Sequence, residues 1–341
     1  MKDRPADREV LHAHALVQVL GREKGLQKAS ADGLDERLVR ILEDFYTSPS
    51  GELGIQFSGW SFLSLPHKAL PPGQRWERTL QTDGFTCSLI VDPGELMLDG
   101  RPQSFGVPFG PTARVILLFL QTQALEQRSR QIEVGSTTYA WLRRLGLGAG
   151  GQDYRRFREQ MLRLLACSVR FLFENRREDG GRVTGFTKNP LIESGIVSLH
   201  DRRNDAQMSF WGDRIILSES FYKTLIEHPV PVDMHAIKTI MHSSVALDVY
   251  GWLAYRLHSL KQPKTIGWMS LMGQFGIGYT RLRKFRERFT EALELALCVY
   301  PQGRVHLSAE GVTLYPSPPP LGEGHHLRLV TNSDRQKLKL A

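Results

Sequence analysis

Apolar residues recur with helical spacing over residues 278–300, in the last part of the chain. At 100° per residue, one arc that can bury against a core holds Leu282, Phe285, Phe289, Ala292, Leu293 and Ala296. The pattern predicts a helix that is anchored by its back, has Thr280 as its N-cap and carries a basic front at its N-terminal end. The basic residues of this front are Arg281, Arg283, Lys284, Arg286 and Arg288. A helix that enters the DNA major groove with its first turns has this layout.

The same pattern occurs earlier in the chain, at an offset of 128 residues. Residues 155–162 read RRFREQML and residues 283–290 read RKFRERFT, so that an Arg-x-Phe-Arg-Glu core is common to both. The polar arc of the first copy carries Arg155, Arg156 and Arg163. A basic first turn on a single helix can be merely a solvated face. Its repetition favours a shared polyanionic ligand.

The flanking segments repeat as well. Each copy begins with a long apolar helix (residues 112–127 and 244–259), for which Thr112 is an N-cap candidate in the first copy. A short helix (136–147 and 266–275), a glycine turn at Gly148 or Gly276 and the basic helix follow. Strands are predicted at 169–174 and 183–186 in the first copy, and at 305–307 and 312–315 in the second. A helix-turn-helix followed by a β-ribbon is a winged helix. We therefore expect an α+β, mostly helical fold of two tandem winged-helix domains related by an internal repeat.

The remaining segments suggest domain boundaries. Residues 1–84 contain an amphipathic helix at 34–46 but few other signals, and are expected to form a partly helical extension that is flexible or orders on assembly. The first domain is expected at 85–232 and the second at 233–316, with a stiff linker at residues 229–231. A disordered tail is expected at 317–341.

Within the first domain, strand-like residues 86–91 and 96–98 flank a turn at residues 92–94, and Asp99–Gly100 is a second turn signal. Residues 175–205 are polar, rich in arginine and glycine, and read as a mobile wing or insert. A strand at 207–217 and a short helix at 218–227, capped by Ser218, are predicted to follow.

Charge and cysteine content narrow the functional class. The net charge is +8 and the sequence pI is about 9.5, which favours a polyanionic partner. The three cysteines are far apart and odd in number, as expected in a reducing compartment without a disulfide framework. The sequence has no run of 18 apolar residues and no apolar signal core at its start, so we expect a soluble, cytoplasmic, plasmid- or nucleoid-associated bacterial protein.

Three stretches together carry a family resemblance: GVPFGPTARVILLFLQTQA from Gly106, REQMLRL from Arg158, and HPVPVD from His228 followed by ALDVYGWLAYRL. Over residues 85–315 the chain resembles the plasmid-encoded RepA-type replication initiators. The resemblance implies two winged-helix domains that bind repeated origin sequences (iterons), opening of an AT-rich region, and recruitment of the host initiator and helicase. It also implies a monomer that is active at the origin, in equilibrium with a homodimer that represses its own promoter. Residues 1–84 and 175–205 fall outside the pattern.

Two short motifs point to other chemistry. Residues 146–151 match G-x-G-x-x-G, but the dinucleotide reading needs a preceding strand, and the residues before Gly146 are helical in pattern. His12 and His14 resemble the metal-binding pair of rolling-circle nicking enzymes, which requires both imidazoles on one strand and a tyrosine nucleophile. They lie in a helix-like run at 10–20. The sequence has no phosphate-binding loop with lysine, so we expect no ATPase. It also has no H-E-x-x-H motif, no paired Cys-x-x-Cys and no carboxylate pair with hydrolytic spacing, so we expect no catalytic residue, no cofactor and no metal.

The sequence therefore favours a duplex DNA-binding initiator that is not an enzyme. A dimeric winged-helix transcription regulator is the first alternative, and a nicking replicase that uses His12, His14 and a tyrosine is the second. Groove-facing residues are expected to be Arg155, Arg156, Arg283 and Lys284, since arginine can bond guanine bidentately. Phosphate contacts are expected from Arg163, Arg281, Arg286 and Arg288, and the candidate set is completed by Arg158 and Thr280.

Overall fold

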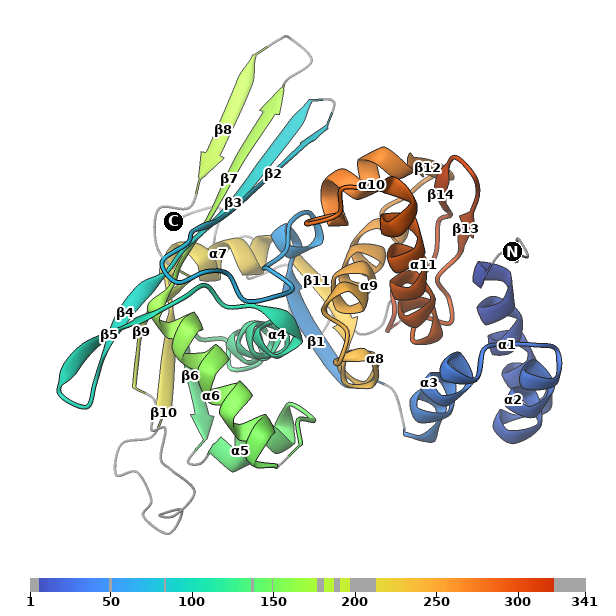
Figure 1. Ribbon diagram of the computed structural model, residues 1–341, viewed down its shortest axis with the longest axis horizontal. Helices are drawn as coiled ribbons and strands as arrows, with labels where there is room; N and C mark the ends of the chain where they lie inside the picture. The colour runs from blue at the N-terminus through green and yellow to red at the C-terminus, as the bar shows by residue number, and fades with distance from the viewer. Residues whose placement is uncertain are drawn as a thin grey trace. The chain divides into compact units, whose positions relative to one another are not determined.

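The computed structural model describes residues 6–48, 51–82, 84–135, 138–148, 150–176, 181–186, 191–196 and 213–321. The chain forms two compact units, coloured from blue to red along the sequence in Figure 1. Unit 1 comprises Met1–Gly54 and Val230–Ala341, and unit 2 comprises Ile55–Pro229. The fold is mixed α/β, with helices predominating over strands. The second boundary lies close to the predicted one at 232/233. Residues 1–54, by contrast, belong to the same unit as the C-terminal part and do not stand apart as an extension.

The long apolar helix of unit 2 is α4 (Gly110–Glu126), which is buried along most of its length. Its N-cap is Phe109, which makes no side-chain cap bond, and a proline lies in its first turn, so the predicted cap at Thr112 is wrong. Two polar residues on its buried side have defined partners. Thr122 accepts a hydrogen bond from the Ile55 amide (2.9 Å) and Gln121 accepts one from the Phe57 amide (2.7 Å). The buried side-chain oxygens of both residues therefore have hydrogen-bond partners in the backbone of β1 (Leu53–Phe57).

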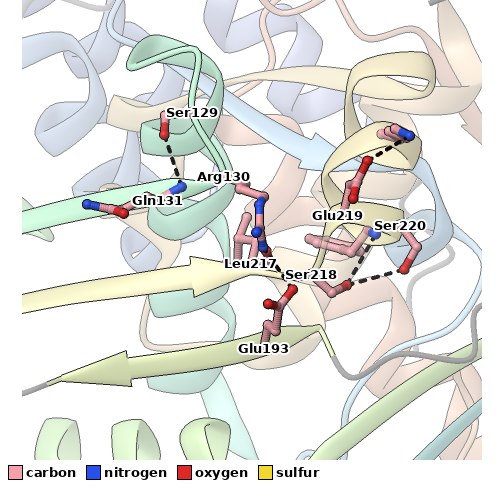
Figure 2. A network of polar contacts seen from close by, with 10 residues as sticks. Ser129, Arg130, Gln131, Glu193, Leu217, Ser218, Glu219 and Ser220 are labelled. Atoms are coloured by element: carbon pink, nitrogen blue, oxygen red, sulfur yellow. Dashed lines mark hydrogen bonds and ion pairs between the residues drawn. The ribbon is translucent and has the colours of Figure 1, made fainter. Parts of the chain in front are cut away.

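Helices α5 (Thr138–Arg144) and α6 (Gly151–Ala166) follow, and α7 (Glu219–Glu227) ends unit 2. A three-stranded antiparallel sheet accompanies them, in the order β6 (Gln131–Gly135), β10 (Asp213–Leu217), β9 (Ile192–Ile196). Figure 2 shows Arg130, which lies just before β6 and contacts both other strands of this sheet. It donates to the Glu193 carboxylate of β9 (2.8 Å) and to the Leu217 carbonyl of β10 (3.3 Å). Beside them Ser218 caps α7 by accepting from the Phe221 amide, as predicted.

A four-stranded antiparallel sheet of unit 2 has the order β2 (Trp76–Thr82), β3 (Phe85–Asp92), β7 (Ser168–Arg176), β8 (Arg182–Phe186). The strands predicted at 169–174 and 183–186 correspond to β7 and β8, and the two pair with each other. Their expected role as the ribbon of the first winged helix is wrong, however, because β7 also pairs with β3 along its whole length. The partner segment lies about 80 residues earlier in the sequence, and no local pattern indicates such a pairing.

A β-hairpin forms from β4 (Gly94–Leu98) and β5 (Arg101–Phe105). The turn residues Asp99 and Gly100 both have positive φ, 50° and 75°, as a two-residue type I′ hairpin turn requires. The predicted hairpin around residues 92–94 is therefore wrong, and the second turn signal is the one that joins two paired strands. The strand before residues 92–94 pairs instead with β2 and β7.

Between residues 230 and 321, unit 1 contains the helices α8 (Met234–Ile240), α9 (Ser244–Leu257), α10 (Trp268–Phe275) and α11 (Leu282–Cys298). Its antiparallel sheet has the order β12 (Lys264–Gly267), β14 (Gly311–Leu314), β13 (Val305–Leu307). The predicted pair of strands after the second basic helix is confirmed as β13 and β14. Trp252, Phe275 and Phe289 form an aromatic core in which neighbouring ring centroids lie 5.3 to 6.4 Å apart.

Residues 6–48 of unit 1 form the helices α1 (Ala6–Leu20), α2 (Arg22–Ala31) and α3 (Glu36–Thr47). Helix α3 confirms the predicted amphipathic helix. At Gly25, α2 approaches the backbone of α1 so closely that a Cβ atom would lie 2.6 Å from the Val17 Cα atom. Residues 6–48 thus form a packed helical layer rather than a loose segment.

The segment predicted as a linker at 229–231 is part of a strand, β11 (Pro229–Asp233), which pairs with β1. The start of the predicted disordered tail is also ordered. Tyr300 donates to the Pro318 carbonyl (2.6 Å), the Ser317 amide donates to the Leu257 carbonyl (3.1 Å), and Leu321 is buried. Residues 322–341 lie outside the described residues, as do 136–137, 177–180, 187–190 and 197–212 within the other predicted segments. No helix in the described ranges is long and apolar enough to cross a membrane.

The internal repeat is visible in the order and pairing of the elements. In unit 2, α4, β6, α5 and α6 precede β9 and β10, and the sheet order is β6-β10-β9. In unit 1, α9, β12, α10 and α11 precede β13 and β14, and the sheet order is β12-β14-β13. The counterpart of the β13–β14 ribbon is therefore β9–β10, and the strands β7 and β8 are inserted between α6 and that ribbon. No strand was predicted at β6, and residues 266 and 267 of β12 were expected to be helical.

Candidate nucleic-acid interface

The turn between α10 and α11 places the second basic helix. Gly276 ends α10 by donating from its amide to the Met272 carbonyl (2.8 Å), and Gly278 has φ of 81°, a conformation that favours glycine. The N-cap of α11 is Arg281, without a side-chain cap bond, so the predicted cap at Thr280 is wrong. Thr280 is exposed on the turn. The first amides of α11 thus lack a side-chain acceptor, and they point along the helix axis as those of a phosphate-binding helix do.

The back of α11 is fixed in the core while its front is exposed. Phe285 and Phe289 are 2% and 1% exposed, and their ring centroids lie 5.4 Å apart. The side chain of Arg283, by contrast, is 92% exposed, and those of Lys284 and Arg288 are 56% and 53% exposed. The periodicity of the sequence therefore predicts correctly which face of α11 is buried.

Within the part of the chain that the structure describes, the ion pairs of Arg283, Lys284 and Arg288 are with carboxylates of the same helix. Arg283 and Lys284 share Glu287, at 3.9 and 3.1 Å, and Arg288 lies 2.8 Å from Glu291. Ion pairs of this kind in water are worth roughly 0–1 kcal/mol. A DNA phosphate can therefore displace the carboxylates at small cost.

Arg286 has a different environment. Its guanidinium carbon lies 4.8 Å from the centroid of the Trp268 ring, and the residue is half-buried. Trp268 in turn donates from its indole nitrogen to the Ser308 carbonyl (3.1 Å), at the turn between β13 and β14. The two side chains thus join α11 to α10 and to the ribbon. Trp268 was not among the predicted site residues, since nothing in its local sequence distinguishes it from a core aromatic.

The first basic helix, α6, has a similar arrangement. Its N-cap is Gly150, with no side-chain cap bond, and Arg155, Arg156 and Arg158 are exposed. Phe157 is 2% exposed and packs edge-on against Trp141 of α5, with ring centroids 5.7 Å apart. The glycine-rich residues 146–151 join α5 to α6, so a helix and not a strand precedes them and the dinucleotide fingerprint is not formed.

Arg163 was expected to hold a phosphate, and the structure corrects that expectation. Its guanidinium donates to the Val107 carbonyl (3.1 Å), pairs with Glu159 (3.0 Å) and lies 5.1 Å from the centroid of the Phe109 ring. Only 19% of the side chain is exposed. Arg163 thus holds the segment that leads into α4. Helical periodicity places it at the edge of the polar arc but cannot identify this distant partner.

The pair His12 and His14 does not form a metal site. His14 is 2% exposed, with Nδ1 2.6 Å from the Tyr46 hydroxyl and Nε2 3.0 Å from the Leu297 carbonyl. Burial lowers the pKa of His14 to about 4. His12 lies on the surface, 3.5 Å from Asp32. Among the described residues, no group of three or more His, Cys, Asp or Glu side chains is arranged to hold a metal ion.

Comparison with known proteins agrees with the fold and with the resemblance seen in the sequence. Residues 107–269 match the RepA_C family model, described as plasmid encoded RepA protein. A crystal structure of selenomethionine derivatives of domains 2 and 3 of RctB aligns with a TM-score of 0.50 at 10% identity, over 76% of this chain and 98% of that chain. A second crystal structure of RctB domains 2–3 aligns with a TM-score of 0.45 at 10% identity, over 76% and 94% of the two chains. At this identity the likeness to RctB concerns the fold alone. No curated protein sequence matches the chain.

Proposed function

We propose that this chain initiates plasmid replication by binding repeated origin sequences through two winged-helix domains, because residues 107–269 match the family model of plasmid-encoded RepA proteins. One domain is built from α4, β6, α5, α6, β9 and β10, and the other from α9, β12, α10, α11, β13 and β14. The order of helix, strand, two helices and ribbon supports this reading in both cases.

The observation that carries the proposal is the repeated presentation of basic residues. Two helices at equivalent places in the chain bury a phenylalanine on one face (Phe157, Phe285) and expose arginines in their N-terminal turns on another. Neither helix has a side-chain N-cap, which leaves amides for phosphates. A duplicated basic end with a rigid back suits two successive contacts along one duplex.

The residues of each helix take different roles in this proposal. Arg155, Arg156, Arg283 and Lys284 face the groove, where a guanidinium can donate two hydrogen bonds to guanine O6 and N7. Arg158, Arg281 and Arg288 hold phosphates together with the free amides, and Thr280 lies beside them on the turn. Arg286 adds positive charge from its position over Trp268. Arg163 is left out, because its donors are directed at Val107 and Glu159.

Initiation further requires strand opening and partners. In this proposal the chain carries no catalytic step of its own, so the free energy for opening an AT-rich segment comes from DNA deformation, supercoiling and bound proteins. The host initiator and the replicative helicase are the proposed partners. A monomer acts at the origin, and a homodimer represses the promoter of its own gene.

The test is a plasmid that carries only the candidate origin, with the protein supplied from a second replicon. Replication of that plasmid supports the proposal. Repeat binding without replication would favour the transcription regulator instead. Relaxed circles with covalently attached protein, after incubation of supercoiled origin DNA with a divalent metal, would favour a nicking enzyme.

The residue-level test is Arg283→Ala with a matched control. We expect a loss of about 1–3 kcal/mol in origin affinity and a relaxed preference at one base pair. Arg40→Ala is the control, because Arg40 is also a well-exposed arginine paired with a glutamate of its own helix, Glu36, in the same unit. An Arg283→Ala protein that discriminates among sites as well as the parent contradicts the base-reading role.

A further inference from the structure

The N-terminal helical layer is joined to the C-terminal end of α11 by a buried polar chain. His14 of α1 and Tyr46 of α3 meet at 2.6 Å, and the other ring nitrogen of His14 lies 3.0 Å from the Leu297 carbonyl. That carbonyl belongs to the last turn of α11, and it also accepts a hydrogen bond from the Tyr300 amide (3.1 Å), just beyond the end of the helix. His14 thus adds a second hydrogen bond to this carbonyl, from a helix far away in the sequence.

The direction of each hydrogen bond follows from the chemistry of the three groups. A carbonyl can only accept, so Nε2 of His14 carries the proton and donates to Leu297. In the neutral ring Nδ1 then accepts, and the Tyr46 hydroxyl donates to it. Burial keeps both groups in these states at neutral pH, because it lowers the pKa of His14 to about 4 and raises the pKa of Tyr46 to about 12. Both polar hydrogens of the chain, on Nε2 of His14 and on the Tyr46 hydroxyl, therefore have an acceptor.

Two further contacts support this chain. Arg37 of α3 lies 3.5 Å from Glu294, one turn before Leu297 on α11. His235 of α8 lies 2.8 Å from the Phe45 carbonyl and stacks on the Phe45 ring at 5.3 Å, which fixes α3 from its other side. Helix α3 is thus held between α8 and α11, and it in turn holds His14.

Given the DNA-binding role proposed above, on which this inference rests, we propose that His14 and Tyr46 are positioning residues for DNA recognition. They anchor the C-terminal turn of α11 and so set the direction in which its basic N-terminal end points. Helices α1–α3 precede the range of the family match, residues 107–269. They are nevertheless part of the DNA-reading unit, although none of the proposed DNA contacts lies on them.

Helix geometry explains why the far end matters. A helix of 17 residues is about 25 Å long, at 1.5 Å per residue. A tilt of about 3° around one end therefore moves the other end by about 1 Å, which is enough to lose the geometry of a base-edge hydrogen bond. Phosphate contacts come from long, flexible side chains and tolerate such a shift. Loosening the anchor should thus reduce discrimination between sequences more than total affinity.

The experiment compares four variants of the full chain on two duplexes: DNA that carries the repeats of its own plasmid origin, and the same DNA scrambled. His14→Leu removes the donor to Leu297, and His14→Gln restores an N–H at a similar place. Tyr46→Phe removes only the hydroxyl. Tyr300→Phe is the matched control, because it also removes a hydrogen-bonded tyrosine hydroxyl in unit 1, one that donates to the Pro318 carbonyl and not to His14. Amide hydrogen exchange of the last turn of α11 is followed in the free proteins.

For His14→Leu we expect the ratio of origin to scrambled affinity to fall about 5-fold, with the salt slope unchanged and faster exchange in the last turn of α11. Tyr46→Phe should lower the ratio about 2-fold, and it keeps the inference testable if His14→Leu fails to fold. His14→Gln and Tyr300→Phe should leave the ratio at the parent value.

Two results would overturn the inference, and they can be told apart. If the parent discriminates but His14→Leu and Tyr46→Phe keep its ratio at temperatures well below melting, the two residues only stabilise the core. If the parent itself binds both duplexes equally, the proposed function fails and the positioning role fails with it.

Discussion

The two units contain the same order of helices and strands, but the strands and contacts around the repeated elements differ. In unit 1, α11 is followed directly by its ribbon, β13 and β14, whereas in unit 2 the strands β7 and β8 intervene and join the sheet of β2 and β3. The C-terminal turn of α11 receives a hydrogen bond from the N-terminal layer. The C-terminal turn of α6 lies instead against β4, so closely that a Cβ atom on Gly94 would collide with the Ala166 carbonyl.

Comparison of α6 with α11 shows which positions are alike in the two helices and which differ. Phe157 and Phe285 occupy the same place and are both 2% exposed, and Met161 and Phe289 are both buried beneath their helices. The cations diverge. Unit 2 uses Arg163 to hold the segment before α4, while unit 1 uses Arg286 to join α11 to Trp268. The buried positions of α6 and α11 are thus occupied by similar residues, whereas the arginines on their polar faces contact different partners in the two units.

The largest effect should come from the shared buried phenylalanine. Phe285→Ala and Phe157→Ala should each destabilise their own unit by about 3–5 kcal/mol, because each leaves a cavity among aromatic rings. Urea unfolding followed by amide exchange in each unit measures this. A loss below about 1 kcal/mol in either case would show that the two positions are not equivalent core sites.

The second largest effect should be a dependence of the unfolding free energy on pH that differs between the two units. Burial is the main cause that raises the pKa of Glu294 to about 7. The folded chain therefore keeps a proton there between about pH 4.5 and 7, where the unfolded chain has lost it. Stability should fall by up to about 3 kcal/mol as pH rises through this window, and stay level above it. Since the position of α6 equivalent to Glu294 is Ala166, this dependence is expected in unit 1 only.

Glu294→Gln should remove that dependence while it keeps an acceptor for Arg37. Denaturant midpoints between pH 4 and 9 test both proteins. Equal slopes for parent and variant across the window would show that another group is responsible.

A smaller difference in stability is expected between substitutions at the two turn glycines, Gly276 before α11 and Gly148 before α6. A Cβ atom at Gly276 would lie 2.5 Å from the Met272 carbonyl oxygen, which is backbone, whereas at Gly148 it would meet the end of the Asp153 side chain, which can move. Gly276→Ala should thus cost about 2 kcal/mol and Gly148→Ala less than about 1 kcal/mol. Thermal melting of the two variants measures these costs. An equal loss of stability would mean that a side chain is equally hard to accommodate at the two turns.

The smallest effect concerns two arginines of α6. Arg163→Ala should lower the stability of unit 2 by about 1 kcal/mol and leave the salt dependence of DNA binding unchanged. Arg158→Ala should do the reverse, leaving stability unchanged and reducing the salt slope by about one. A lower salt slope for Arg163→Ala would return Arg163 to the set of phosphate contacts.

Local periodicity explains what the sequence could predict. Helices α3, α7, α9 and α11 and the ribbon β13–β14 were predicted with ends close to those observed, because each has an apolar face or a cap that is visible in sequence. The short strands β6 and β12 were missed, since strands of four or five residues carry little periodic signal. The pairing of β3 with β7 also lies beyond local patterns.

Individual site residues show the same limit. The exposure of Arg283 follows from its place opposite Phe285, which the sequence gives directly. The role of Arg163 depends on its hydrogen bond to the Val107 carbonyl. The role of His14 depends on Leu297, which is more than 280 residues away in the sequence. Such partners are set by tertiary packing, and no spacing rule identifies them.

The central claim is that α6 and α11 read two stretches of one duplex, and hydroxyl-radical footprinting of the origin tests it most directly. The parent should protect two separate stretches in each repeat. Arg283→Ala should weaken one of them and Arg155→Ala the other. A single protected stretch, or the same change in both variants, would contradict the account.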